Sequence, residues 1–168
     1  MATLFSNQLL ALAQEVIQRS RESARRISCA ESCTGGLLSA LLTEIPGSSA
    51  VIHLNFVTYA NEAKTAMLAV EPQLLAAHGA VSKPVALAMA SGARRNTRAD
   101  IAVAITGIAG PGGGSAEKPV GTVYIATASD NECTAQCFQF IGDRTEIRLQ
   151  ATEQALLMLL DQLRASGH

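Results

Sequence analysis

A serine stands at a turn of the sequence that is built for close contact with a ligand. The segment Glu31-Ser32-Cys33-Thr34-Gly35-Gly36 follows a short apolar run and precedes a helical one. Residues between a strand and a helix face the usual ligand crevice of open α/β folds. Their free N–H groups can hold a phosphate or an oxyanion, so Ser32 is a candidate nucleophile. The alternative is that Ser32 or Thr34 caps the helix, and the Gly-x-Ser-x-Gly elbow is absent.

A lysine in a second segment could activate that serine. Thr58-Tyr59-Ala60-Asn61-Glu62-Ala63-Lys64 places Lys64 about one helical turn beyond Asn61, the expected N-cap. If its neighbours lower the pKa of this amine, Lys64 can act as a general base. Tyr59 ends the preceding strand. The alternatives are a solvated lysine and a packed tyrosine ring with a wet hydroxyl.

Histidine gives a weaker candidate for the same role. The chain has three histidines, and none of them is brought beside Ser32 by its position in the sequence. A Ser-Lys or Ser-Lys-Tyr arrangement is therefore favoured over a Ser-His-Asp triad. The three are His53, which begins a strand, His78 in a helix C-cap, and the terminal His168.

A glycine-rich loop provides a candidate anion site. Five glycines occur in residues 107–115, after an apolar run, but neither the Rossmann nor the P-loop spacing is present. Consecutive backbone N–H groups can still form an anion nest. The alternative is a plain flexible connection. Lys118 could reach an anionic group, and Arg144 at the start of the last helix is a second cation that could bind an anion. The alternatives are an exposed surface lysine and an arginine paired with Asp143 or Glu146.

The hydrophobic pattern predicts a helical layer on each side of a mixed sheet. Apolar residues repeat with the helical period from Phe5 to Ile17, whereas 101–106 is a continuous apolar run typical of a buried strand. We expect one α/β domain over residues 1–168, an α/β/α sandwich with a mixed sheet. The predicted strands are 27–30, 51–59, 101–106, 120–127 and 133–140, and the later helices are 37–42, 61–64 onward, 71–77, 85–96 and 143–164.

The overall charge disfavours a nucleic-acid-coating surface. The 13 Lys+Arg nearly balance the 14 Asp+Glu, whereas DNA-binding surfaces have a basic excess. The cluster Arg19, Arg21, Arg25 and Arg26 is better explained by a helix C-terminus. No secretory signal or membrane-spanning run is found, so we expect a cytoplasmic protein without nucleic-acid or membrane partners.

Four cysteines form two C-x3-C pairs, Cys29 with Cys33 and Cys133 with Cys137. A zinc site from these pairs is conceivable, but structural zinc sites favour C-x2-C spacing. We therefore expect buried free thiols and no metal.

Seven blocks of the sequence, in order, resemble the CinA C-terminal domain family, from about Leu9 to Leu163. They are Ala30-Glu31-Ser32-Cys33-Thr34-Gly35-Gly36, Gly47-Ser48-Ser49, Val57-Thr58-Tyr59-Ala60-Asn61-Glu62-Ala63-Lys64, His78-Gly79-Ala80-Val81-Ser82, Thr106-Gly107-Ile108-Ala109-Gly110-Pro111 with Gly113-Gly114, Lys118-Pro119-Val120-Gly121-Thr122-Val123, and Gly142-Asp143-Arg144.

The resemblance implies an amidohydrolase of pyridine nucleotide salvage that converts nicotinamide mononucleotide to nicotinate mononucleotide and ammonia. Ser32 would be the nucleophile and Lys64 the base, assisted by Tyr59, with no cofactor and no metal. A homodimer is also implied. The other interpretation is a non-catalytic nucleotide-binding or competence-related module, since fold alone does not settle function. The expected substrate-binding residues are Cys33, Thr34, Gly35, Gly36, Ser48, Asn61, Thr106, Gly107, Gly110 and Arg144.

Overall fold

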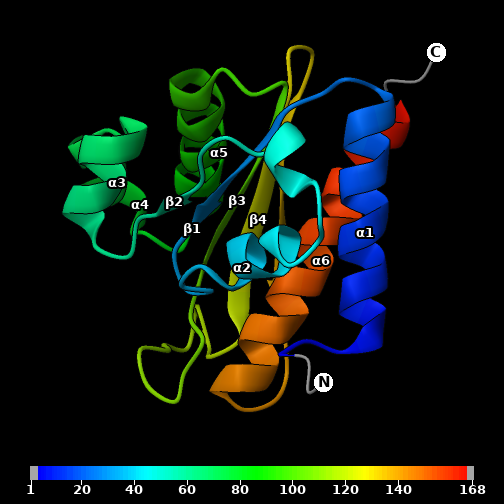
Figure 1. Ribbon diagram of the computed structural model, residues 1–168. Helices are drawn as coiled ribbons and strands as arrows, with labels where there is room; N and C mark the ends of the chain where they lie inside the picture. The colour runs from blue at the N-terminus through cyan, green and yellow to red at the C-terminus, as the bar shows by residue number, and fades with distance from the viewer. Residues whose placement is uncertain (1–3, 166–168) are drawn as a thin grey trace.

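Five strands form one mixed sheet in the order β2-β1-β3-β4-β5 in the computed structural model, which describes residues 4–165 (Figure 1). The central strand β3 pairs parallel to β1 and antiparallel to β4, and β2 and β5 form the two edges. The strands are β1 (Ile27–Glu31), β2 (Phe56–Val57), β3 (Ile101–Gly107), β4 (Thr122–Ala128) and β5 (Cys133–Gln139).

Helices cover both faces of this sheet, which confirms the predicted α/β fold with a mixed sheet. α1, α2 and α6 pack on one face, and α5 packs on the other with α3 and α4 beside it (Figure 1). Within residues 4–165, no helix has the length and hydropathy needed to cross a bilayer. The helices are α1 (Asn7–Glu22), α2 (Leu37–Thr43), α3 (Asn61–Leu68), α4 (Pro72–His78), α5 (Lys83–Thr97) and α6 (Arg144–Ala165), with one 3-10 turn, η1 (Ser48–Ala50).

The two faces of the sheet carry side chains of different size. Because neighbouring residues of a strand point to opposite faces, β3 sends Val103 and Ile105 toward α1 and α6. It sends Ala102 and Ala104 toward α5. Small side chains under α5 allow that helix to lie close to the sheet.

A glycine also brings α5 close to α3, the helix that carries Lys64. A Cβ added at Gly92 would lie 2.0 Å from the carbonyl oxygen of Leu68, the last residue of α3. No side chain fits into that distance. The absence of a side chain at Gly92 therefore fixes how closely the end of α3 approaches α5.

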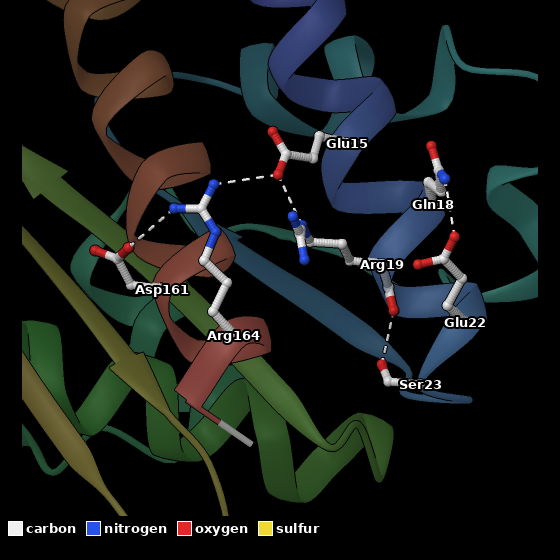
Figure 2. A network of polar contacts seen from close by, with 7 residues as sticks. All are labelled: Glu15, Gln18, Arg19, Glu22, Ser23, Asp161 and Arg164. Atoms are coloured by element: carbon white, nitrogen blue, oxygen red, sulfur yellow. Dashed lines mark hydrogen bonds and ion pairs between the residues drawn. The ribbon is translucent and has the colours of Figure 1, made fainter. Parts of the chain in front are cut away.

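The exposed sides of α1 and α6 are joined by a small polar network (Figure 2). The Glu15 carboxylate accepts from Arg19 Nε at 2.7 Å and from Arg164 Nη2 at 3.1 Å. The hydrogen bond from Arg19, followed by that from Arg164, lowers the pKa of Glu15. Exposed ion pairs contribute little to stability, so the apolar contacts beneath them hold the two helices together.

The predicted strand over residues 51–59 was wrong in extent. Only Phe56–Val57 forms a strand, and Ile52 makes an isolated bridge to Ile27. Between them, side chains replace the backbone ladder, because Ser28 Oγ donates to the Leu54 carbonyl and Cys29 N–H donates to Asn55 Oδ1.

The cysteines are free, but only half of them are buried. Cys29 and Cys33 lie in the interior, as expected, whereas Cys133 and Cys137 are exposed. The difference arises because both exposed thiols belong to the edge strand β5. Among residues 4–165, no group of three or more His, Cys, Asp and Glu side chains is arranged to hold a metal ion.

Candidate active site

Ser32 is the first residue of the turn after β1, and the backbone on both sides of it is fixed. Its N–H donates to the carbonyl of Ile105 on β3, and its own carbonyl accepts from Gly35 N–H, each at 3.0 Å. Gly35 and Gly36 have φ of +61° and +97°, which glycine adopts without strain. The side chain is more buried than expected at 8% exposure, yet it lines a cavity.

The amine of Lys64 lies 3.0 Å from the Ser32 hydroxyl oxygen. Lys64 comes from α3 and is 1% exposed, so the expectation of a solvated lysine does not apply. Its other two partners are the backbone carbonyls of Thr58 at 2.9 Å and Tyr59 at 3.1 Å. Burial lowers the pKa of this amine below its ordinary value of 10.5.

This arrangement suits a neutral amine as well as a protonated one. A neutral amine has two N–H donors and one lone pair. If the two carbonyls take the donors, the lone pair is directed at Ser32, whose hydroxyl can then donate its proton. Thr58 N–H donates in turn to the Glu31 carbonyl at 2.8 Å. The end of β1 therefore positions both Ser32, which follows it in the chain, and Thr58, whose carbonyl contacts Lys64.

The cavity above Ser32 and Lys64 measures about 280 Å³. Its walls come from the ends of β1 and β3, the start of α3, the glycine loop and the start of α6. Thr106 is held in the wall by a hydrogen bond from its hydroxyl to the Ala80 carbonyl at 2.8 Å. Of the expected substrate-binding residues, six line this cavity: Cys33, Asn61, Thr106, Gly107, Gly110 and Arg144.

Tyr59 and Arg144 stand together at the cavity wall. Arg144 Nη2 donates to the Tyr59 hydroxyl at 3.0 Å, and Nη1 donates to the Gly110 carbonyl at 2.6 Å. Tyr59 therefore presents its carbonyl to Lys64 and its hydroxyl to Arg144. The hydroxyl has no recorded bond to Lys64 or Ser32, which differs from the arrangement expected for a tyrosine that assists the base. The cavity is open to solvent where Tyr59 forms its wall, since Tyr59 is 62% exposed.

The start of α2 is already occupied by a carboxylate of the protein itself. The buried Glu31 side chain accepts from the N–H groups of Gly36, Leu38 and Ser39. Thr34, Gly35 and Gly36 do not line the cavity, and their expected role in binding substrate is not supported by this geometry. Thr34 is not a cap either, because its hydroxyl donates to Glu31.

Glu31 and Arg148 are the residues that sequence reasoning missed. Arg148 lies one helical turn beyond Arg144 on α6 and donates to the Thr34 carbonyl at 2.8 Å. The sequence did contain a sign of the role of Glu31, because this residue directly follows the predicted strand 27–30 of mostly apolar residues. A charged residue that is buried in such a place must have hydrogen-bond partners.

Other candidates lie outside the cavity or lack the local role expected of them. Ser48 does not line the cavity, because it begins η1 and its carbonyl accepts from Val51 and Ile52 N–H. Asn61 is the first residue of α3 and makes no cap bond, since Ala60 holds the N-cap position. Lys118 donates to the His78 carbonyl at 3.0 Å. Neither His53 nor His78 lines the cavity, and His168 is outside the described residues.

Cys33 lies beside the candidate nucleophile but is a poor competitor for it. Burial raises the pKa of its thiol to about 11. A thiol with that pKa is protonated at neutral pH, and the thiolate is the nucleophilic form. Cys33 is therefore a neutral part of the cavity wall.

A larger cavity of about 720 Å³ lies along α1 and the segment after α2. It is lined by Gln14, Ile17, Gln18, Arg21, Glu22, Ile45 and Pro46, and so contains no serine, cysteine, lysine or histidine. The smaller cavity is the one that joins a hydroxyl to a buried amine, and chemistry rather than volume identifies the site.

The family model and the curated relatives that match this chain agree on one family. The family model described as the CinA C-terminal domain matches residues 9–163. A CinA-like protein of Geotalea uraniireducens is 55% identical over 143 residues, which is 85% of this chain and 34% of that protein. A CinA-like protein of Anaeromyxobacter sp. (strain K) is 50% identical over 91% of this chain and 38% of its own. The chain thus spans about a third of the length of these relatives.

Solved structures give the same result for the fold. The competence/damage inducible protein CihA of Agrobacterium tumefaciens has a TM-score of 0.93 and 48% identity, with 97% of this chain and 99% of that chain covered. A CinA superfamily protein of Escherichia coli has a TM-score of 0.89 and 34% identity, with 96% and 94% covered.

Proposed function

Because the chain belongs to the CinA C-terminal domain family, which includes amidases, we propose that it hydrolyses nicotinamide mononucleotide to nicotinate mononucleotide and ammonia. The observation that carries the proposal is the 3.0 Å contact between Ser32 Oγ and the buried amine of Lys64 at the wall of a cavity. A serine paired with a buried lysine is an established solution for acyl transfer.

The first half of the reaction transfers the acyl group to the enzyme. Ser32 Oγ attacks the carboxamide carbon while Lys64 accepts the hydroxyl proton. The tetrahedral intermediate collapses as Lys64 returns that proton to the departing nitrogen, and ammonia leaves. Such proton transfer typically contributes about 10²–10⁴-fold to the rate.

The second half repeats the chemistry with water. Lys64 takes a proton from a water molecule, whose oxygen attacks the ester carbon. Collapse breaks the bond to Ser32 Oγ, and the proton held by Lys64 returns to that oxygen. Nicotinate mononucleotide is released, and the free amine and hydroxyl are restored.

The N–H group of Cys33 is the proposed oxyanion donor. It directly follows the nucleophile in the turn, as in other serine hydrolases, and Cys33 lines the cavity. The N–H groups of Gly35 and Gly36 are excluded, because Gly35 N–H bonds the Ser32 carbonyl and Gly36 N–H bonds Glu31.

The substrate phosphate is proposed to bind near Arg144 and the glycine loop. Arg144 supplies a positive guanidinium in the cavity wall, and Gly110, Gly112 and Gly113 border the same space. The start of α2 is not available to the phosphate, since Glu31 fills it.

Assembly and location complete the proposal. A homodimer is proposed, with the segment around β2 at the edge of the sheet as its surface, because Val57 of β2 is 52% exposed and the preceding Leu54 is 48% exposed. Sedimentation equilibrium measures the mass of the assembly independently of its shape. A cytoplasmic location fits four cysteines that are all free thiols.

Ammonia release from the purified protein supplied with nicotinamide mononucleotide tests the proposal. Ser32→Ala should abolish turnover and leave the unfolding temperature nearly unchanged, because only one hydroxyl is removed. Ser49→Ala, an exposed serine outside the cavity, is the matched control and should keep full activity. The dephosphorylated riboside should react less efficiently if Arg144 and the loop hold the phosphate.

Turnover that survives in Ser32→Ala would refute the covalent mechanism. If the wild-type protein binds the nucleotide by calorimetry yet releases no ammonia, the chain is a nucleotide-binding module instead.

A further inference from the structure

Glu31 is a buried carboxylate beside the nucleophile that the chemistry above does not use. It ends β1, is 0% exposed and directly precedes Ser32. Five hydrogen bonds reach its two oxygens. Oε2 accepts from Thr34 Oγ1 at 2.6 Å and from the N–H groups of Gly36 and Leu38 at 3.1 Å each, and Oε1 accepts from Ser39 N–H at 2.8 Å and Ser39 Oγ at 2.6 Å.

These partners fit a carboxylate and no other side chain of that size. A carboxylate only accepts hydrogen bonds, and every recorded partner here donates one. The three N–H groups belong to the first turn of α2, where the helix itself provides no acceptor. Glu31 therefore supplies acceptors from within the chain to N–H groups that the helix leaves without one.

The same hydrogen bonds close the turn around Ser32. Thr34 is held from both sides, because its hydroxyl donates to Glu31 and its carbonyl accepts from Arg148. The Glu31 carbonyl accepts from Thr58 N–H, and Thr58 presents its own carbonyl to Lys64. Glu31 is thus joined directly both to the turn and to the segment that holds the base.

We propose that Glu31 is a positioning residue for Ser32. Its carboxylate fixes residues 33–36 so that the serine hydroxyl stays 3.0 Å from Lys64 and the N–H group of Cys33 stays directed at the substrate. The inference rests on the proposed function only in taking Ser32 as the nucleophile. It holds for any substrate that this serine attacks.

Glu31→Gln is the sharpest variant, because it keeps the shape and replaces one acceptor oxygen with an NH₂ donor. In either orientation of the amide, at least one N–H of α2 then faces another donor. A shift of about 1 Å in a reacting group costs on the order of 10²-fold. We expect the reaction of Ser32 to slow by at least about tenfold, toward that limit, with the KM for nicotinamide mononucleotide unchanged and the kcat reduced.

The primary measurement does not depend on the natural substrate. A fluorophosphonate reacts covalently with an activated serine, and intact mass spectrometry gives both the rate constant and the fraction of molecules labelled. A slower rate constant at full labelling supports positioning. A lower labelled fraction with the wild-type rate constant means that Glu31 only maintains the fold, and it overturns the proposal.

A second variant decides the matter if Glu31→Gln does not fold. Ser39→Ala removes one donor and leaves the carboxylate in place, so Ser32 should be labelled about two- to fivefold more slowly, an intermediate effect. Thr43→Ala is the matched control, since it removes another hydroxyl of α2 that bonds only the carbonyls of Ser39 and Ala40. Equal labelling rates for Ser39→Ala and Thr43→Ala would overturn the proposal.

The two proposals fail in different ways. If wild-type Ser32 is labelled but no ammonia is released, the proposed function fails and the comparison of labelling rates still tests Glu31. If wild-type Ser32 is not labelled, there is no activated serine to position, and the inference about Glu31 is overturned as well.

Discussion

The α2 side and the α3 side of Ser32 each bury one ionisable side chain, and the two side chains have very different partners. On the α2 side, Glu31 is surrounded by five hydrogen-bond donors. On the α3 side, Lys64 meets only two carbonyls and a hydroxyl, and burial lowers the pKa of its amine. Burial alone therefore does not decide the role of an ionisable group. The partners decide it: five donors hold the Glu31 carboxylate in place, whereas the amine of Lys64 is able to accept a proton from Ser32.

Removal of the amine of Lys64, on the α3 side of Ser32, should have the largest effect on catalysis. Lys64→Met keeps the length of the side chain and removes the base, so kcat should fall by about 10²–10⁴-fold. Steady-state ammonia release gives the value. Lys83→Met, on an exposed lysine outside the cavity, is the control and should be near wild type. A Lys64→Met variant with wild-type kcat would mean that the two sides do not differ in function.

Substitution of Glu31, on the α2 side of Ser32, should lower the stability of the protein as well as the rate at which Ser32 reacts. Glu31→Gln leaves at least one buried N–H of α2 without its acceptor, which typically costs about 1–3 kcal/mol. Urea unfolding measures the difference in the free energy of unfolding from wild type. Thr43→Ala should change it much less, since the hydroxyl lost there is exposed. An unchanged midpoint for Glu31→Gln would contradict the conclusion that these hydrogen bonds hold the turn in place.

The pH dependence of unfolding should distinguish the two sides further. Burial places the pKa of Lys64 in the folded protein below its ordinary value of 10.5. At a pH between the folded-state pKa and 10.5, the unfolded chain therefore holds more protons than the folded protein. Wild type should therefore become more stable relative to Lys64→Met as pH rises through that window, by at most about 1.4 kcal/mol per pH unit. Below the window the difference should be flat. A difference that shrinks with rising pH would contradict the lowered pKa.

The smallest effect is expected at Tyr59. Its hydroxyl bonds Arg144 and its carbonyl bonds Lys64, so Tyr59→Phe removes only the contact with Arg144. We expect kcat to change by less than about tenfold, and any loss to appear mainly in KM, because the phosphate is proposed to bind at Arg144. A loss of 10²-fold or more in kcat would restore the tyrosine hydroxyl as part of the proton transfer.

Local patterns in the sequence predicted the elements that depend on few neighbours. The apolar run at 101–106 indicated β3, and the order of strands and helices predicted the mixed sheet. The segment 51–59 has strand-like composition, but side chains of Ser28 and Asn55 took the backbone partners that a strand would have used. That competition depends on distant parts of the chain.

The site was predictable in its residue types and not in its geometry. The sequence singled out Ser32 and Lys64, and the structure brings them within hydrogen-bond distance. It did not reveal that the carboxylate of Glu31 fills the start of α2, because five donors converge there only after the turn has formed. The exposed Cys133 and Cys137 were missed for a similar reason, since an edge strand is recognised only once the strand order is known.

The position of Lys64 in the site depends on Gly92, a residue that does not line the cavity. α3 rests against α5 at the point where the Leu68 carbonyl faces Gly92, and Lys64 lies one turn earlier on α3. Even a methyl group at position 92 would push that helix outward and carry the amine away from Ser32. A substitution there would thus be mistaken for damage to the reacting groups, although its origin is a collision between the new side chain at position 92 and the Leu68 carbonyl, four residues beyond Lys64 on α3.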